Sequence, residues 1–160
     1  MEKLVKLNGR WNIESKSDVW QGTAILTDDG WFEGIVVDPN STYKGNRLVF
    51  GCYILEKRIE MLKLTPTIVS DPLIFRVWGK KNAKYTGAIY VAGNVLEIKI
   101  GTVVIDIEEL HEIDMTELKS KIQLYKDVMD HKNRIFYNNV NDVRDMIIDL
   151  ITLEVEDPLY

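Results

Sequence analysis

Few side chains in this 160-residue chain are suited to catalysis. The two histidines, His111 and His131, follow the β-rich part of the sequence and stand near acidic residues. A histidine beside a carboxylate can bind a metal or act as a base, but exposed histidines are the commoner arrangement. The single cysteine, Cys52, lies in an apolar run, which predicts a buried thiol. We therefore predict no catalytic residue, no metal site and no cofactor.

Carboxylates are the remaining candidates for acid–base chemistry. Most of them stand opposite the apolar face of an alternating run and are expected outside. Glu33 and Glu60 are exceptions, because their runs alternate poorly and either side chain is able to face inward. The sequence has no phosphate loop, nucleophile elbow or metalloprotease motif. We expect that the protein is not an enzyme.

Aromatic side chains are better candidates for a binding site, since ligand pockets combine apolar walls with a few polar groups. Several of them lie on or beside strand-like runs, and some of these must serve as core. The predicted ligand-binding residues are Trp11, Trp20, Trp78, Tyr53, Tyr85 and Arg76.

Arg76 is the one charged residue in the apolar run Ile74–Trp78. Strict alternation would place it on the same face as Ile74 and Trp78. If that face points inward, the guanidinium needs a carboxylate such as Glu33 or Glu60, or an anionic ligand. If it points outward, no such partner is required, and the sequence leaves both arrangements open.

A predicted hairpin, Trp20–Asp38, organises the elements that must position these residues. Two β-rich runs flank the turn Asp28-Asp29-Gly30, and each run contains a glycine two residues after an aromatic. The aromatic-X-Gly pattern returns at Tyr85–Gly87. Interior glycines allow strands to bend sharply, as barrel closure requires, and the alternative is a twisted open sheet with ordinary bulges.

Short turns separate eight or nine strand-like runs before residue 110, and no helix-length segment interrupts them. This pattern predicts an antiparallel up-and-down β-barrel over residues 1–110. The last run reaches Gly101-Thr102, where the chain is expected to turn or bulge. A barrel of this size has room inside for side chains or one small ligand.

The motif Gly9-Arg10-Trp11-Asn12 in the first run resembles the Gly-X-Trp signature of lipocalins and avidins. The resemblance covers residues 4–108 as a pattern and implies a calycin-like barrel in which Trp11 closes one end. It supports a fold and not biotin binding. Lipocalins place an arginine against that tryptophan late in the barrel, whereas residues 77–133 contain no arginine.

Residues 111–160 change to a helical period. Asp114 and Glu117 form a helix start, and Met115, Leu118 and Ile122 begin an apolar stripe. A second helix is predicted after Asn139 or Asn141. This acidic helical hairpin carries six Lys or Arg and eleven Asp or Glu, so it holds the whole net charge of −5. It is expected to pack on the barrel as part of one structural domain, or to bind a partner chain.

Composition and charge limit the function. The hydrophobic content of 46% is ordinary, and no apolar run is long enough to be a membrane helix. The negative charge argues against nucleic acid as a partner, and without a signal-peptide core we expect a cytoplasmic location. The first hypothesis is non-enzymatic binding of a small apolar or amphipathic ligand in the barrel. The second is a protein-interaction module that uses the hairpin to bind a partner or a second copy of itself.

Overall fold

The computed structural model describes residues 1–40, 45–54, 57–65, 73–79, 84–92, 97–111 and 114–132. Eight strands precede one helix, α1 (Thr116–Lys132). The strands are β1 (Lys3–Ile13), β2 (Lys16–Leu26), β3 (Trp31–Val37), β4 (Arg47–Ile54), β5 (Arg58–Leu64), β6 (Leu73–Trp78), β7 (Tyr85–Ala92) and β8 (Glu97–Leu110).

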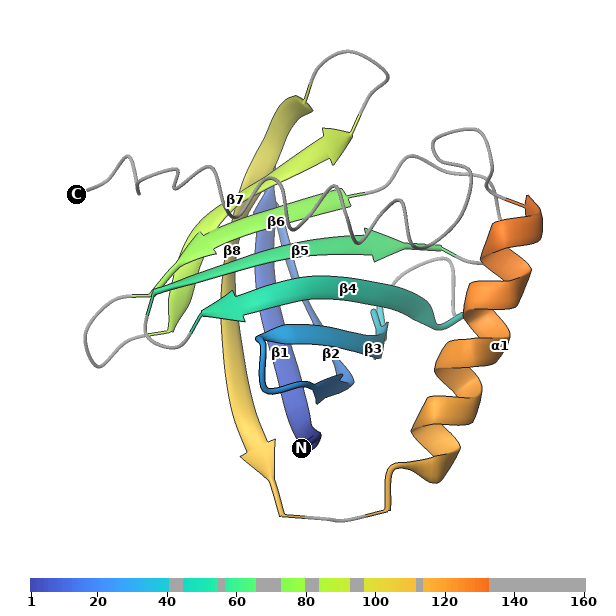
Figure 1. The fold of residues 1–160 in the computed structure, drawn as a ribbon. Helices are drawn as coiled ribbons and strands as arrows, with labels where there is room; N and C mark the ends of the chain where they lie inside the picture. Colours follow the sequence, from blue (N-terminus) through green and yellow to red (C-terminus); the bar gives the residue numbers. More distant parts are fainter. Residues whose placement is uncertain are drawn as a thin grey trace.

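The strands form a closed antiparallel barrel in sequence order, with β8 paired back to β1 (Figure 1). The predicted barrel is therefore confirmed, with eight strands in the described residues. The run that was expected to turn or bulge near Gly101 continues as the single strand β8. Its register with β7 shifts between Ile89 and Tyr90, so this point is a bulge and not a turn.

Glycines stand where neighbouring strands approach most closely. A Cβ atom at Gly22 would collide with the backbone oxygen of Ile35, and one at Gly9 would collide with the indole of Trp20. Gly9 pairs with Trp20 across β1 and β2, so the missing side chain makes room for the largest residue of the core. These glycines serve the close approaches that the closed barrel requires.

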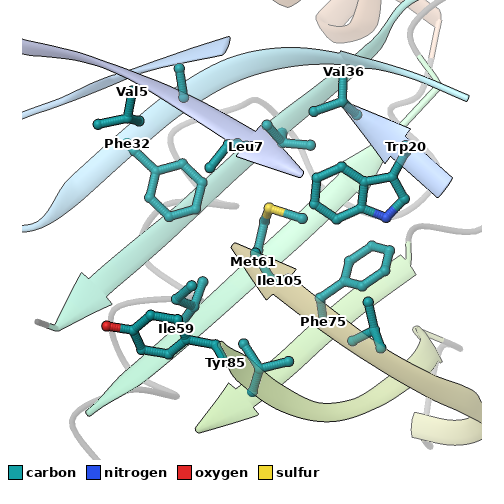
Figure 2. Packing of buried hydrophobic residues seen from close by; sticks show 14 of the residues in the cluster. Val5, Leu7, Trp20, Phe32, Val36, Ile59, Met61, Phe75, Tyr85 and Ile105 are labelled. Carbon is teal, nitrogen blue, oxygen red and sulfur yellow. The ribbon is translucent and has the colours of Figure 1, made fainter. Parts of the chain in front are cut away.

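The inner face of the barrel is mostly apolar. Figure 2 shows the indole of Trp20 near the ring of Phe75, with the Met61 thioether beside them. The two rings meet edge to face at 5.7 Å between centroids. Phe32 lies farther along the same interior and is also buried. These side chains line the barrel interior, as the alternation of faces along the strands predicts.

Part of the outer wall is also apolar. Leu48, Phe50, Leu62 and Ile74 from β4, β5 and β6 form a second buried cluster that includes Ile122 of α1. The helix lies along the outside of the barrel (Figure 1) and contacts β2, β3 and β4. The first helix of the predicted hairpin is therefore confirmed. The second helix, and the rest of residues 133–160, lie outside the described residues.

The helix start follows the predicted capping chemistry. The Asp114 carboxylate accepts a hydrogen bond from the backbone N–H of Thr116 at 3.0 Å, and this bond lowers the pKa of Asp114. Within the part of the chain that the structure describes, no helix is long and apolar enough to cross a membrane.

Candidate functional site

The structure divides the predicted ligand-binding residues between the two faces of the barrel wall. Trp20 and Tyr85 belong to the inner core, and Trp11 and Tyr53 pack against it. Arg76 and Trp78 instead lie on the outer face, because β6 turns Phe75 and Val77 inward. The prediction that Arg76 shares a face with Ile74 and Trp78 is right, and that face points outward.

One pair of the predicted residues meets inside the barrel. The Tyr85 and Tyr53 hydroxyls lie 3.3 Å apart, and the two rings meet edge to face at 5.7 Å. The backbone N–H of Tyr53 also donates to the carbonyl of Gly30, in the turn before β3. These contacts tie the end of β4 to the start of β7 and to the β2–β3 turn, which is a packing role.

A second group inside the barrel is charged. Asp38 follows β3, Arg47 begins β4, and Lys63 is the penultimate residue of β5. Lys63 Nζ lies 2.7 Å from Asp38 Oδ2, and Arg47 Nε lies 2.9 Å from the same oxygen. All three residues are at least nine-tenths buried. We call Asp38, Arg47 and Lys63 the inner triad.

Strand alternation explains why the inner triad faces inward. Lys63 is in phase with Ile59 and Met61, and Asp38 is in phase with Phe32 and Val36, all of which are core residues. The Lys63 ammonium lies 5.7 Å from the centre of the Trp20 ring and 5.8 Å from that of Phe75. The two aromatic rings therefore lie beside the ammonium group, at distances typical of cation–π contacts.

The inner triad leaves polar atoms unused. Among the described residues, neither Asp38 Oδ1 nor the Trp20 indole nitrogen Nε1 has a hydrogen-bond partner, although both atoms are buried. Most buried polar groups in proteins are hydrogen-bonded, and an exception calls for an explanation. The inner triad therefore has one unpaired acceptor, Asp38 Oδ1, and the neighbouring Trp20 has one unpaired donor, Nε1.

Burial also acts on the titration of Lys63. Loss of hydration lowers the pKa of Lys63, and the positive charge of Arg47 lowers it further, whereas the charge and hydrogen bond of Asp38 raise it. The net direction is downward. The lysine is thus held charged less firmly than an exposed lysine.

The carboxylates Glu33 and Glu60 both lie on the outer face and do not enter the barrel. Glu60 is fully buried between two arginines on β5 and β6. Arg76 donates through Nε and Nη2 at 2.8–3.1 Å, and Arg58 Nη2 donates at 2.9 Å. We call Arg58, Glu60 and Arg76 the outer triad. A carboxylate partner was expected only for an inward Arg76; Arg76 faces outward and still pairs with Glu60, because this part of the outer wall is also buried.

Aromatic rings support the arginines of the outer triad. The Arg58 guanidinium carbon lies 5.4 Å from the centre of the Trp78 ring, and that of Arg76 lies 5.0 Å from the centre of the Tyr90 ring. Trp78 therefore packs on an ion network of the outer wall. Both oxygens of Glu60 accept hydrogen bonds, so this network uses its carboxylate completely.

A hollow of about 400 Å³ lies between α1 and the outer wall at β2 and β3. Ile25, Trp31 and Ile122 supply apolar lining. The charged groups around it are paired, with Lys126 2.8 Å from Glu33 and Lys119 3.0 Å from Glu2. The hollow therefore has space for a small molecule, and both of its lysines already form ion pairs with carboxylates.

Asp38, Arg47 and Lys63 were not predicted from the sequence as site residues. Strand alternation could have indicated that Lys63 faces inward, since it falls on the same face of β5 as the apolar Ile59 and Met61. The described residues contain no group of three or more potential metal ligands. Comparisons with protein-family models, curated proteins and solved structures find no match to this chain.

Proposed function

We propose that this protein is a non-catalytic binding protein for a small amphipathic ligand, and that the inner triad and Trp20 hold the polar part of that ligand inside the barrel. The observation that carries the proposal is a buried cluster of three charges that leaves Asp38 Oδ1 and Trp20 Nε1 without partners. The likeness to lipocalins and avidins, at the level of a closed antiparallel barrel, supports the same proposal.

Energetics favour a functional explanation of the inner triad. Removing charges from water costs several kcal/mol per ion in order of magnitude, and well-packed apolar residues of similar size often stabilise a protein as well or better. The core cluster beside the inner triad is apolar, so apolar side chains of similar size could take the place of the three charged ones. A ligand with a polar head and an apolar body matches the charged inner triad and the aromatic rings of Trp20 and Phe75 beside it.

Brominated octanol tests the proposal, because bromine quenches tryptophan fluorescence only at short range. We expect saturable quenching of the native protein by 8-bromooctan-1-ol. The quenching should be lost in Trp20→Phe and kept in Trp31→Phe. Trp31 is the matched control because it lines the hollow between α1 and the outer wall.

Two outcomes contradict the proposal. Absence of saturable quenching in the native protein would show that no ligand of this class binds. Quenching that survives Trp20→Phe and disappears in Trp31→Phe would place the ligand in the outer hollow. Thermal melting of both variants checks that they remain folded.

The alternative function, protein interaction through the C-terminal helical hairpin, stays a prediction. Ile122 of α1 is buried against the barrel, so this face of the helix already has a structural role. The predicted second helix would supply any recognition surface. Light scattering over a range of protein concentrations tests self-association.

A further inference from the structure

The outer faces of β5 and β6 are buried, although they point away from the barrel interior. Glu60 is 0% exposed, Arg58 is 3% exposed and Trp78 is 8% exposed. One face of an antiparallel sheet usually meets solvent, so an outward face this deeply buried needs a cover. These exposed fractions are those of a single chain, so the cover belongs to the chain itself.

Packing of α1 does not account for this burial. The helix packs on β2, β3 and β4, whereas Arg58, Glu60 and Arg76 lie on the next two strands around the barrel. Among the described elements, α1 is the one that lies outside the barrel. The cover of β5 and β6 must therefore come from residues outside the described ranges.

We propose that the outer face of β5 and β6 is the docking surface for the C-terminal segment, residues 133–160. This segment follows α1 directly, whereas each of the other stretches outside the described residues contains at most seven residues, as at 66–72. β6 has six residues and spans about 20 Å, and a ten-residue helix spans about 15 Å. The C-terminal segment is therefore long enough to reach and cover both strands.

Charge favours this occupant. Two arginines and one glutamate contribute a formal charge of +1 to the outer face, whatever further contacts Arg76 makes. Residues 133–160 contain two arginines and six acidic residues. An acidic segment beside a cationic face reduces the cost of burying the arginines.

The apolar residues of the face and of the segment agree as well. Leu62, Ile74 and Trp78 share the outer face with the outer triad and are buried. The predicted second helix carries an apolar stripe at helical spacing, made of Val143, Met146, Ile147, Leu150 and Ile151. Such a helix gains most of its stability by packing its apolar face. A partner chain that binds this stripe would therefore have to displace the segment from the barrel.

A nitroxide label on the full chain tests the position of the segment, because the label weakens the NMR signals of nearby amides. Thr152→Cys places it opposite the predicted stripe, in a Cys52→Ala background that removes the native thiol. We expect the largest loss of signal in β5 and β6 and the smallest in β1 and β2, which lie across the barrel. Reduction of the nitroxide restores the reference spectrum and checks that the labelled protein is folded.

Matched variants sharpen the test. Leu124→Cys, at an exposed position of α1, should instead weaken the signals of β2, β3 and β4. Replacement of Asp142, Asp145 and Asp149 by Asn should reduce the signal loss in β5 and β6, whereas replacement of the same three residues by Glu should preserve it. An unchanged loss in the Asn variant would contradict the role of charge in the docking.

Two further outcomes overturn the inference. Equal loss in all strands, or the largest loss in β1 and β2, would show that the segment does not cover the outer triad. A mixture of labelled chain with isotope-enriched, unlabelled chain reports contacts between copies. Loss of the β5 and β6 signals in that mixture would show that a second copy covers the face. Neither outcome affects the proposed ligand site, which is tested separately by tryptophan quenching.

Discussion

The barrel wall contains two buried triads of one carboxylate and two cations, one on each face. In the outer triad, the two arginines use both oxygens of Glu60. In the inner triad, Arg47 and Lys63 both pair with one oxygen of Asp38, and the other oxygen has no partner among the described residues. Equal charge counts therefore accompany different hydrogen bonding of the carboxylate: the unpaired buried atom is a carboxylate oxygen in the inner triad and a guanidinium nitrogen, Arg58 Nε, in the outer triad.

The two triads also differ in their cations: the outer triad has two arginines, whereas the inner triad has one arginine and one lysine. Arginine is always charged and presents a planar fork that suits a fixed carboxylate. Lysine has a compact charge, rotates freely and loses its proton more readily when buried. The outer triad therefore has the features of a structural network, whereas the inner triad has those of a site that can respond to a ligand or to pH.

Removal of the outer carboxylate is expected to have the largest effect. Glu60→Gln leaves Arg58 and Arg76 buried beside a neutral amide, and neither arginine can release its proton. The free energy of unfolding, measured by urea titration, should fall by about 3–5 kcal/mol. Glu109→Gln, which removes an exposed ion pair with Lys3, is the control and should cost no more than about 1 kcal/mol. Equal losses would contradict the structural role of the outer triad.

Removal of the inner carboxylate should cost less. Asp38→Asn also leaves two buried cations, but Lys63 is able to lose its proton and reduce the charge. We expect a loss of about 1–3 kcal/mol in the same urea titration. A loss larger than that of Glu60→Gln would show that the inner triad is the more important network for stability.

Removal of one cation from each triad tests which of the two networks stabilises the fold. Lys63→Met keeps the Asp38–Arg47 ion pair and places a flexible apolar side chain near Trp20 and Phe75, so the change in unfolding free energy should stay within about 1 kcal/mol. Arg76→Met removes the hydrogen bonds to Glu60 Oε1 and should cost about 1–3 kcal/mol. The reverse order would mean that Lys63 stabilises the fold.

The pH dependence of stability should show the smallest difference. Because burial lowers the pKa of Lys63, the unfolded chain binds more protons than the folded one between the folded pKa and the ordinary lysine value of 10.5. The native protein should therefore gain stability relative to Lys63→Met as the pH rises through this window. Urea titrations of both proteins across the alkaline range measure it, and a constant difference would contradict the lowered pKa.

Much of the fold could be predicted from the sequence, because closure requires glycines at close approaches and the aromatic-X-Gly pattern marks them. Gly22, Gly34 and Gly87 all lie on strands of the barrel at such points. The helix start at Asp114 was predictable for a similar reason, since capping is a local interaction. These features depend on residues near one another in sequence.

The site was harder to predict, because alternation gives two faces and does not say which is inside. Every residue of β5 is buried, although Arg58 and Glu60 on one face and Lys63 on the other are charged, so neither face of this strand is marked as the solvent side. The sequence therefore does not say whether Arg76 or Lys63 faces the interior. The closed barrel decides this, because it fixes which face of β5 and of β6 points inward. The pairing of Asp38 with Lys63 joins a residue just after β3 to one on β5, which no local pattern can show.

Closure through β1 and β8 also has a consequence for how the chain folds. Leu4 pairs with Leu110 and Ile13 with Gly101, so β1 and its second partner strand, β8, are separated by roughly a hundred residues of chain. Until then β1 presents an open edge on which another chain can pair. Barrel closure should therefore be a late, slow step, and folding yield should fall as protein concentration rises during refolding.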